Sequence, residues 1–217
     1  MSNSLQSWVH EHIAREAIAD TISVRGDGWC GWRALAAQHY HNQDRYLEVK
    51  EEMLLVAKVN ADVYMKYLCG SCEAEYEKVI KALEYGITSE TKHMRTKFCP
   101  SRFWFDANTM AQIAADALGI PIATYATETE NWHNPLLHLP LSPPLPGIKP
   151  QPYVLHLVGN HYHSLKMRPA IKVTWPPVPS FHEKAWHTMN VPADWKTSWR
   201  HIHRNSTIIK KFFIEID

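Results

Sequence analysis

The amino-acid sequence predicts a globular chain that mixes helices with short strands, and three observations support this class. Hydrophobic residues make up 45% and charged residues 21% of the 217 residues, a composition typical of a chain with a packed core. Apolar side chains recur at helical spacing in several stretches, and short apolar runs elsewhere are bounded by glycine or proline. The length suits one domain, or one domain with an extension.

Helices are expected wherever apolar residues recur every three or four positions. The expected helical ranges are 5–18, 30–41, 45–68, 73–85 and 107–118. Asp106 or Asn108 is placed to cap the last of these helices, and Gly119 is placed to end it.

Short strands are expected around these helices. Residues 20–28 indicate an extended piece entering a tight turn, 120–127 and 153–159 indicate strands, and 165–167 indicate a return strand after a turn over 160–164. The proline-rich residues 134–152 are predicted to form a surface loop. Beyond Arg168 the chain is rich in proline and tryptophan, which suggests an extension packed on the core.

The composition of the chain limits which partners it is expected to bind and where in the cell it is expected to work. The net charge is +1, so neither nucleic acid nor an anionic membrane is expected as a partner. The N-terminus lacks the apolar core of a signal peptide, and no run reaches the roughly 18 apolar residues of a spanning helix. Four cysteines are too few for a disulfide framework in this length. We therefore expect an intracellular monomer, in the cytoplasm, the nucleus or both.

Cys30 has the surroundings that most favour chemistry. It stands in GDGWCGWRAL, residues 26–35, between a Gly-Asp-Gly turn and an expected helix. A helix N-terminus stabilises a thiolate, and glycines let backbone N–H groups converge on one point, as an oxyanion hole requires. The alternative is a small apolar residue packed under a turn, which the flanking glycines disfavour.

A cysteine nucleophile needs a general base, and His161 is the candidate among the 14 histidines. It follows a predicted strand that ends near Gly159, so it is expected at a sheet edge, where it can face a helix N-terminus. The long separation from Cys30 in sequence suits partners that meet only in the fold.

These residues carry a family resemblance. GDGWCGWRAL resembles the Asp-Gly-Asn-Cys-Leu-Phe-Arg-Ala motif of the ovarian-tumour (OTU) cysteine proteases, and NHYHSL, residues 160–165, resembles their His-Tyr-Asp/Asn-Ser-Val motif. FWFDANTMAQIAADALGIPIATY, residues 103–125, resembles the segment between those motifs. The resemblance covers residues 20–168. It implies a papain-like α+β fold, a small central sheet flanked by helices.

The resemblance also implies roles and domains. Cys30 is the implied nucleophile, His161 the base, and Asp27 the active-site aspartate, with oxyanion donors from the backbone of Gly28, Trp29 and Cys30. No cofactor is implied. The implied division is an N-terminal helix over 1–19, a catalytic domain over 20–168 and an extension over 169–217.

Two positions depart from the family motifs. Trp29 stands where the family has asparagine, and is expected to reshape the cleft wall. His163 stands where many members carry the Asp or Asn that orients the imidazole. Asp27, His163 and Asn160 therefore all stay open as the orienting group.

Substrate contacts follow from the ubiquitin tail that the family recognises, which is basic and ends in Gly-Gly. A narrow tunnel passes glycine and excludes larger side chains. Trp29, Trp32 and Trp104 are candidates to line it. Asp106 and Glu128 are candidates to pair with the arginines of the tail, although each also suits a helix cap or a solvated charge.

Cys69 and Cys72 have the spacing of half a zinc site, but no second pair follows. A helix end with two ordinary thiols is the preferred interpretation, and no metal site is predicted.

The sequence thus leads to the hypothesis of a cysteine-dependent deubiquitinase that hydrolyses isopeptide bonds at the C-terminus of ubiquitin or a ubiquitin-like modifier. Two alternatives remain open: a catalytically weak ubiquitin-binding module, and a polyprotein-processing OTU protease of viral or mobile-element origin.

Overall fold

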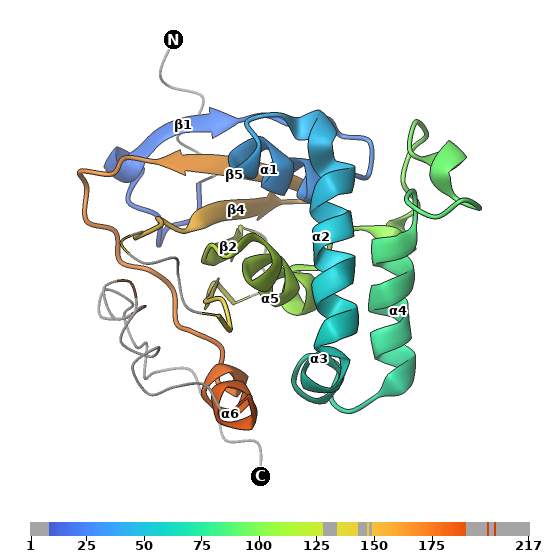
Figure 1. The fold of residues 1–217 in the computed structure, drawn as a ribbon. Coiled ribbons are helices and arrows are strands. Elements are labelled where there is room, and N and C mark those ends of the chain that lie inside the picture. Colours follow the sequence, from blue (N-terminus) through green and yellow to red (C-terminus); the bar gives the residue numbers. More distant parts are fainter. Residues whose placement is uncertain are drawn as a thin grey trace.

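The computed structural model describes residues 9–127, 134–142, 147, 149–189, 199 and 202. A five-stranded mixed sheet lies at the centre, with the strand order β1-β5-β4-β2-β3 (Figure 1). Its strands are β1 (Ile18–Ile22), β2 (Ile122–Ala126), β3 (Leu136–His138), β4 (Tyr153–Val158) and β5 (His161–Met167). Only the β2–β4 pair is parallel among the described pairs.

Helices flank this sheet and confirm the expected α+β class. They are α1 (Cys30–His39), α2 (Tyr46–Val59), α3 (Ala61–Tyr67), α4 (Glu73–Glu84), α5 (Ala107–Leu118) and α6 (Phe181–Thr188). Short 3-10 turns occupy Arg15–Ala17, Gln43–Arg45, Lys92–Met94 and Ser101–Phe103. Helix α1 packs on β5 and β4, α5 packs on β2 and β3, and α2 packs on both helices.

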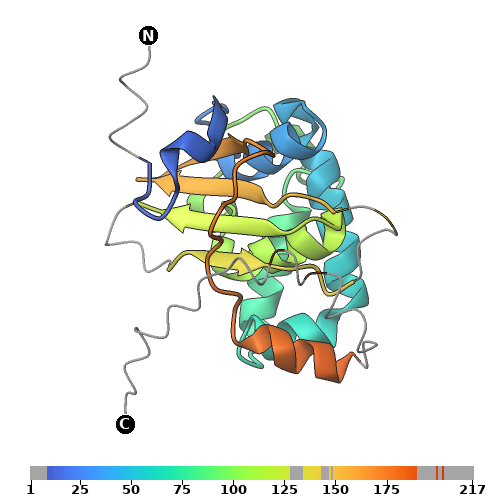
Figure 2. The same cartoon turned by 90° about the vertical axis from the view of Figure 1, so that its left-hand side faces the viewer.

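The segment after β5 crosses the sheet and reaches its far edge. Figure 2 shows it running past the strands on its way to α6. The amide of Leu137 in β3 donates to the carbonyl of Pro177, 2.9 Å away, which ties the segment to the edge strand. Val173 and Trp175 are buried along this path.

The predicted N-terminal helix over 5–18 is wrong across its described part. Residues 9–14 form turns, one 3-10 turn follows, and β1 then pairs antiparallel with β5. Thr21 lies opposite Leu165 in this register. The unpaired edge of β5 offers backbone hydrogen bonds that outweigh a weak helical periodicity. Strand β1 also crosses the predicted domain boundary between residues 19 and 20.

Three other expectations changed in detail. The helix over 45–68 is split at Asn60, whose φ of −110° and ψ of 32° leave the helical region. The predicted loop over 134–152 contains β3, because its buried Leu137 packs in the core. The turn over 160–164 is shorter than expected, and β5 already begins at His161.

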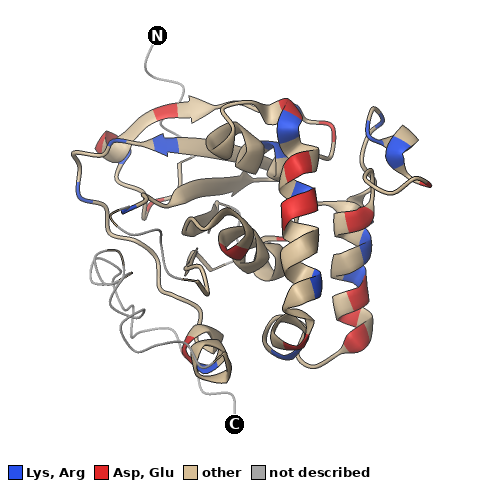
Figure 3. Cartoon of the chain, viewed as in Figure 1, with Lys and Arg blue, Asp and Glu red and all other residues tan. Residues whose placement is uncertain are grey.

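The remaining helix predictions are confirmed. Helix α4 occupies nearly all of 73–85, and Asp106 caps α5 by accepting a hydrogen bond from the amide of Asn108 at 3.1 Å. Gly119 ends α5 with a φ of 64°, which glycine adopts without strain. Figure 3 shows acidic and basic residues interspersed along α2 and α4. None of the helices in the described ranges has the length and apolar character that crossing a bilayer requires.

Candidate active site

A tight turn delivers Cys30 to the first position of α1. The carboxylate of Asp27 accepts a hydrogen bond from the amide of Trp29 at 3.1 Å, and Gly28 adopts a φ of 78°. Helix α1 begins at Cys30 without a side-chain cap on Trp29. Cys30 therefore stands at the N-terminus of α1, where the first N–H groups have no partners within the helix and the helix dipole favours an anion.

The Cys30 thiol lies against the start of β5. Only 6% of Cys30 is exposed, and this burial raises the pKa of its thiol. Backbone hydrogen bonds from Tyr162, Gly31 and Cys30 itself favour the thiolate and act against that rise. Tyr162 directly follows His161, so the structure brings Cys30 to the strand end that carries the predicted base.

His161 is half-buried beside the same loop. A Cβ atom on Gly26 would lie 3.7 Å from Nδ1 of His161, so the loop before Cys30 covers the imidazole. Burial lowers the pKa of His161, whereas a hydrogen bond with the Val24 backbone and the charge of Asp27 raise it. Because that bond favours the protonated ring, the Val24 carbonyl is its acceptor. The Val24 carbonyl is therefore a fourth candidate to orient the imidazole, and one that sequence reasoning missed.

Asp27 is engaged by Arg33 rather than by the imidazole. Nε of Arg33 lies 3.1 Å and 3.0 Å from the two carboxylate oxygens, and Nη2 lies 2.8 Å from Oδ2. Arg33 is 4% exposed and also donates to Asp44 at 2.8 Å. This fork fixes the loop that precedes Cys30, while Asp27 acts on His161 through its charge.

The other two candidate orienters lie on either side of His161. Asn160 is exposed in the turn between β4 and β5. His163 lies two residues along β5, with its ring centroid 4.8 Å from that of His161 in an edge-on arrangement. Burial and the charge of His161 both lower the pKa of His163, so a second cation beside His161 is disfavoured.

Two tryptophans expected in the cleft lie in the core. Trp29 and Trp32 are both 0% exposed. Trp29 stacks on Tyr85 with centroids 5.6 Å apart, and its Nε1 donates to the Lys97 carbonyl at 2.9 Å. Neither side chain lines a cleft or reshapes its wall, because both pack beneath the first turn of α1.

Trp104 and Asp106 lie closer to the surface, and both line a depression of about 320 Å³. Nε1 of Trp104 donates to the Cys99 carbonyl at 2.8 Å, and that carbonyl lies against Gly28. Trp104 is thus the residue that links the depression to the Cys30 loop. Both carboxylate oxygens of Asp106 accept hydrogen bonds from the first turn of α5, one from the amide of Asn108 and one from the hydroxyl of Thr109. Glu128 lies outside the described residues.

An aromatic row behind Cys30 was not foreseen. Phe105 meets Trp32 edge-on at 5.2 Å and Tyr162 edge-on at 5.6 Å. A Cβ atom on Gly31 would lie 2.5 Å from the Cβ of Phe105, which explains why this position carries glycine. The absent side chain at Gly31 was the sequence signal for a close neighbour.

The remaining sequence signals lie away from Cys30. Cys69 is buried and Cys72 is exposed at the start of α4, as expected for a helix end. No group of His, Cys, Asp and Glu side chains among the described residues is arranged to hold a metal ion.

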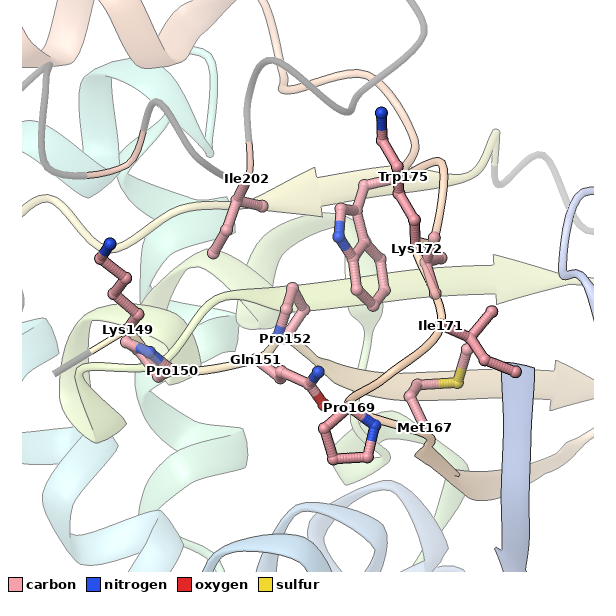
Figure 4. A pocket seen from close by; sticks show the side chains of 11 residues that line it. Lys149, Pro150, Gln151, Pro152, Met167, Pro169, Ile171, Lys172, Trp175 and Ile202 are labelled. Carbon is pink, nitrogen blue, oxygen red and sulfur yellow. The ribbon is translucent and has the colours of Figure 1, made fainter.

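A second depression, of about 250 Å³, lies at the opposite end of β4 and β5. Figure 4 shows Trp175 on its wall, with Lys149 and Lys172 on either side. It is separated from Cys30 and His161 by the length of both strands.

Comparison with known proteins gave a likeness of fold. No protein-family model and no curated protein sequence matches the chain. The chain is similar to the viral OTU domain protease of Farallon virus, with 18% identity over 69% of this chain and 84% of that one and a TM-score of 0.45. The corresponding protease of Qalyub virus gives 18% identity, coverage of 72% and 88%, and a TM-score of 0.45. The OTU domain of OTUD1 gives 15%, coverage of 67% and 84%, and 0.41. The function of this chain is therefore inferred from its own residues.

Proposed function

We propose that this protein is a cysteine-dependent hydrolase that cleaves the isopeptide bond after the C-terminal glycine of ubiquitin or a ubiquitin-like modifier. One observation carries the proposal: the Cys30 thiol at the start of α1 meets the backbone of Tyr162, the neighbour of His161. The motifs around Cys30 and His161, which resemble those of OTU proteases, support ubiquitin as the substrate class. We propose further that it works inside the cell as a monomer.

The residues perform the reaction in two halves. His161 takes the proton of the Cys30 thiol as the sulfur attacks the glycine carbonyl. Backbone N–H groups of Gly28 and Cys30 stabilise the oxyanion, and the imidazolium then protonates the departing amine. The Trp29 N–H, which was expected as a further donor, already donates to the Asp27 carboxylate. Water attacks the resulting thioester, gives its proton to His161, and releases the acid together with the thiol.

Hydrolysis of a fluorogenic amide at the ubiquitin C-terminus, and of ubiquitin dimers, tests the proposal. We expect turnover by the wild-type chain, none by Cys30→Ala, and unchanged turnover by Cys72→Ala, which removes an exposed thiol from a distant helix end. Circular dichroism of each variant checks the fold. Full turnover by a folded Cys30→Ala variant would overturn the assignment.

A ubiquitin-binding module without turnover is the second candidate. The burial of Cys30, with its raised thiol pKa, favours this function, because both make the thiol less reactive and neither prevents the surrounding surface from binding ubiquitin. Saturable binding of ubiquitin by the wild-type chain, with no hydrolysis of any conjugate, would select this function over the first.

A further inference from the structure

Lys50 is an ionisable side chain that lies inside the core. It stands on α2, is 0% exposed, and its Nζ donates to the Ala82 carbonyl at 2.7 Å. Ala82 belongs to the last turn of α4, whose carbonyls lack amide partners within their own helix. Lys50, a side chain of α2, thus caps the C-terminal end of α4, where the helix dipole is negative.

The ammonium group of Lys50 also lies over the faces of two indole rings. Nζ lies 4.5 Å from the ring centroid of Trp32 and 4.9 Å from that of Trp29. Lys50 forms no ion pair with a carboxylate in the part of the chain that the structure describes. Burial lowers the pKa of Lys50 to about 7, and the titratable group that faces it is the Cys99 thiol, whose own pKa burial raises to about 12. Below about pH 7 the side chain is therefore a cation, which two π-systems and one carbonyl stabilise.

The two tryptophans bracket the nucleophile. Trp29 immediately precedes Cys30, and Trp32 follows it by two residues, so both rings move with the first turn of α1. Their shared contact with Lys50 joins that turn to α2 and, through Ala82, to α4. This contact also accounts for Trp29, the motif departure that the cleft did not explain.

We propose that Lys50 is a positioning residue for Cys30: its ammonium clamps the indoles of Trp29 and Trp32 and so fixes the thiol and the oxyanion amides of the first turn. The inference rests on Cys30 being the nucleophile of the proposed function. Losing the charge frees both rings to shift, which misplaces the thiol while leaving the apolar core intact.

Lys50→Met, which removes the charge and keeps most of the volume, is the first test. At about pH 6, where Lys50 is protonated, we expect the alkylation rate of Cys30 by iodoacetamide to fall about tenfold relative to that of the exposed Cys72 in the same molecule, as determined from peptide masses. We expect kcat on the ubiquitin amide to fall by a similar factor with KM unchanged. Lys50→Arg, which keeps a cation for both rings, should restore most of the loss.

Lys58→Met is the matched control. Lys58 is also on α2 and also reaches α4, through an ion pair with Glu84 at 2.8 Å, but its side chain is 55% exposed. This variant should react as the wild type does. A Lys50→Met variant with wild-type Cys30 reactivity would overturn the proposal. So would a loss that Lys50→Arg does not recover while the unfolding temperatures of all variants agree.

The outcome is separable from the proposed function. If the wild-type chain does not hydrolyse ubiquitin conjugates but Lys50→Met still slows Cys30 alkylation, the substrate assignment is wrong and the positioning role of Lys50 is supported. If the wild-type chain hydrolyses ubiquitin and Lys50→Met does so equally well, the clamp fails and the assignment stands.

Discussion

The carbonyl oxygen of Cys99 lies 2.4 Å from the position that a Cβ atom on Gly28 would occupy. Trp104 Nε1 lies 2.9 Å from the same position, and the amide of Cys99 donates to the Asp27 carbonyl at 2.8 Å. The loop before α1 is thus pressed against the segment around Cys99. Only a residue without a side chain fits at Gly28.

Gly28→Ala should therefore damage the active site. A positive φ alone costs an alanine about 1 kcal/mol, and here the backbone must also move away from Cys99. We expect kcat/KM to fall at least about a hundredfold, because the oxyanion amides move with the loop.

Gly70→Ala is the matched control for that variant. Gly70 has a φ of 58°, and nothing lies within 4 Å of its would-be Cβ. It should lose about 1 kcal/mol of stability and no activity. Equal kinetics for the two variants would contradict the steric account of Gly28.

Arg33→Met should loosen the Cys30 loop by leaving Asp27 without its fork. Arg33 is 4% exposed and Asp27 is 30% exposed, so water can reach only one side of the broken pair. We expect the free energy of unfolding to fall by about 2 kcal/mol in urea titrations. Lys81→Met, which breaks the exposed pair with Glu77, should change it by less than about 0.5 kcal/mol. Similar losses from both would show that the fork does not hold the loop.

The Val24 carbonyl as imidazole orienter predicts tolerance at the two side-chain candidates. A substitution cannot remove a backbone carbonyl, so His163→Ala and Asn160→Ala should each keep kcat/KM within about threefold of the wild type. Asp27→Asn should cost more, because Arg33 loses one of its two carboxylate partners and His161 loses the charge of Asp27. A loss of about a thousandfold in a folded His163→Ala variant would instead assign the orienting role to His163.

The pH dependence follows from the two shifted groups. The base must be neutral to take a proton, and burial lowers the pKa of His161, so activity should persist below about pH 6.5, the ordinary histidine value. Burial raises the pKa of Cys30, so its thiolate accumulates only at alkaline pH.

Alkylation of Cys30 should accordingly keep rising from pH 7 to pH 9 and should lag behind that of exposed Cys72. A plateau of Cys30 reactivity already at pH 6 would mean a preformed thiolate–imidazolium pair, which contradicts this account.

The sequence was informative where local chemistry decides structure. Asp106 and Gly119 delimit α5 because capping is a local property, and the glycines around Cys30 indicate a turn for the same reason. It was misleading where distant pairing decides: residues 9–18 have helical periodicity, but the free edge of β5 recruits β1.

At the site, the order of the motifs predicted that Cys30 and His161 belong together. The positions of the side chains around them could not be predicted from the sequence. Trp29 and Trp32 were expected in the cleft, but tryptophan suits a cleft and a core equally well. Only their burial over Lys50 in the structure shows that they belong to the core. The Val24 carbonyl has no sequence signature at all, since every residue carries one.

Intact mass after incubation with ubiquitin bearing a C-terminal electrophile tests the central claim most directly. We expect the wild-type chain to gain the mass of one ubiquitin, with the modified peptide containing Cys30, and the folded Cys30→Ala variant to gain none. An adduct of equal yield in Cys30→Ala, or none in the wild-type chain, would contradict a ubiquitin-directed thiol at Cys30.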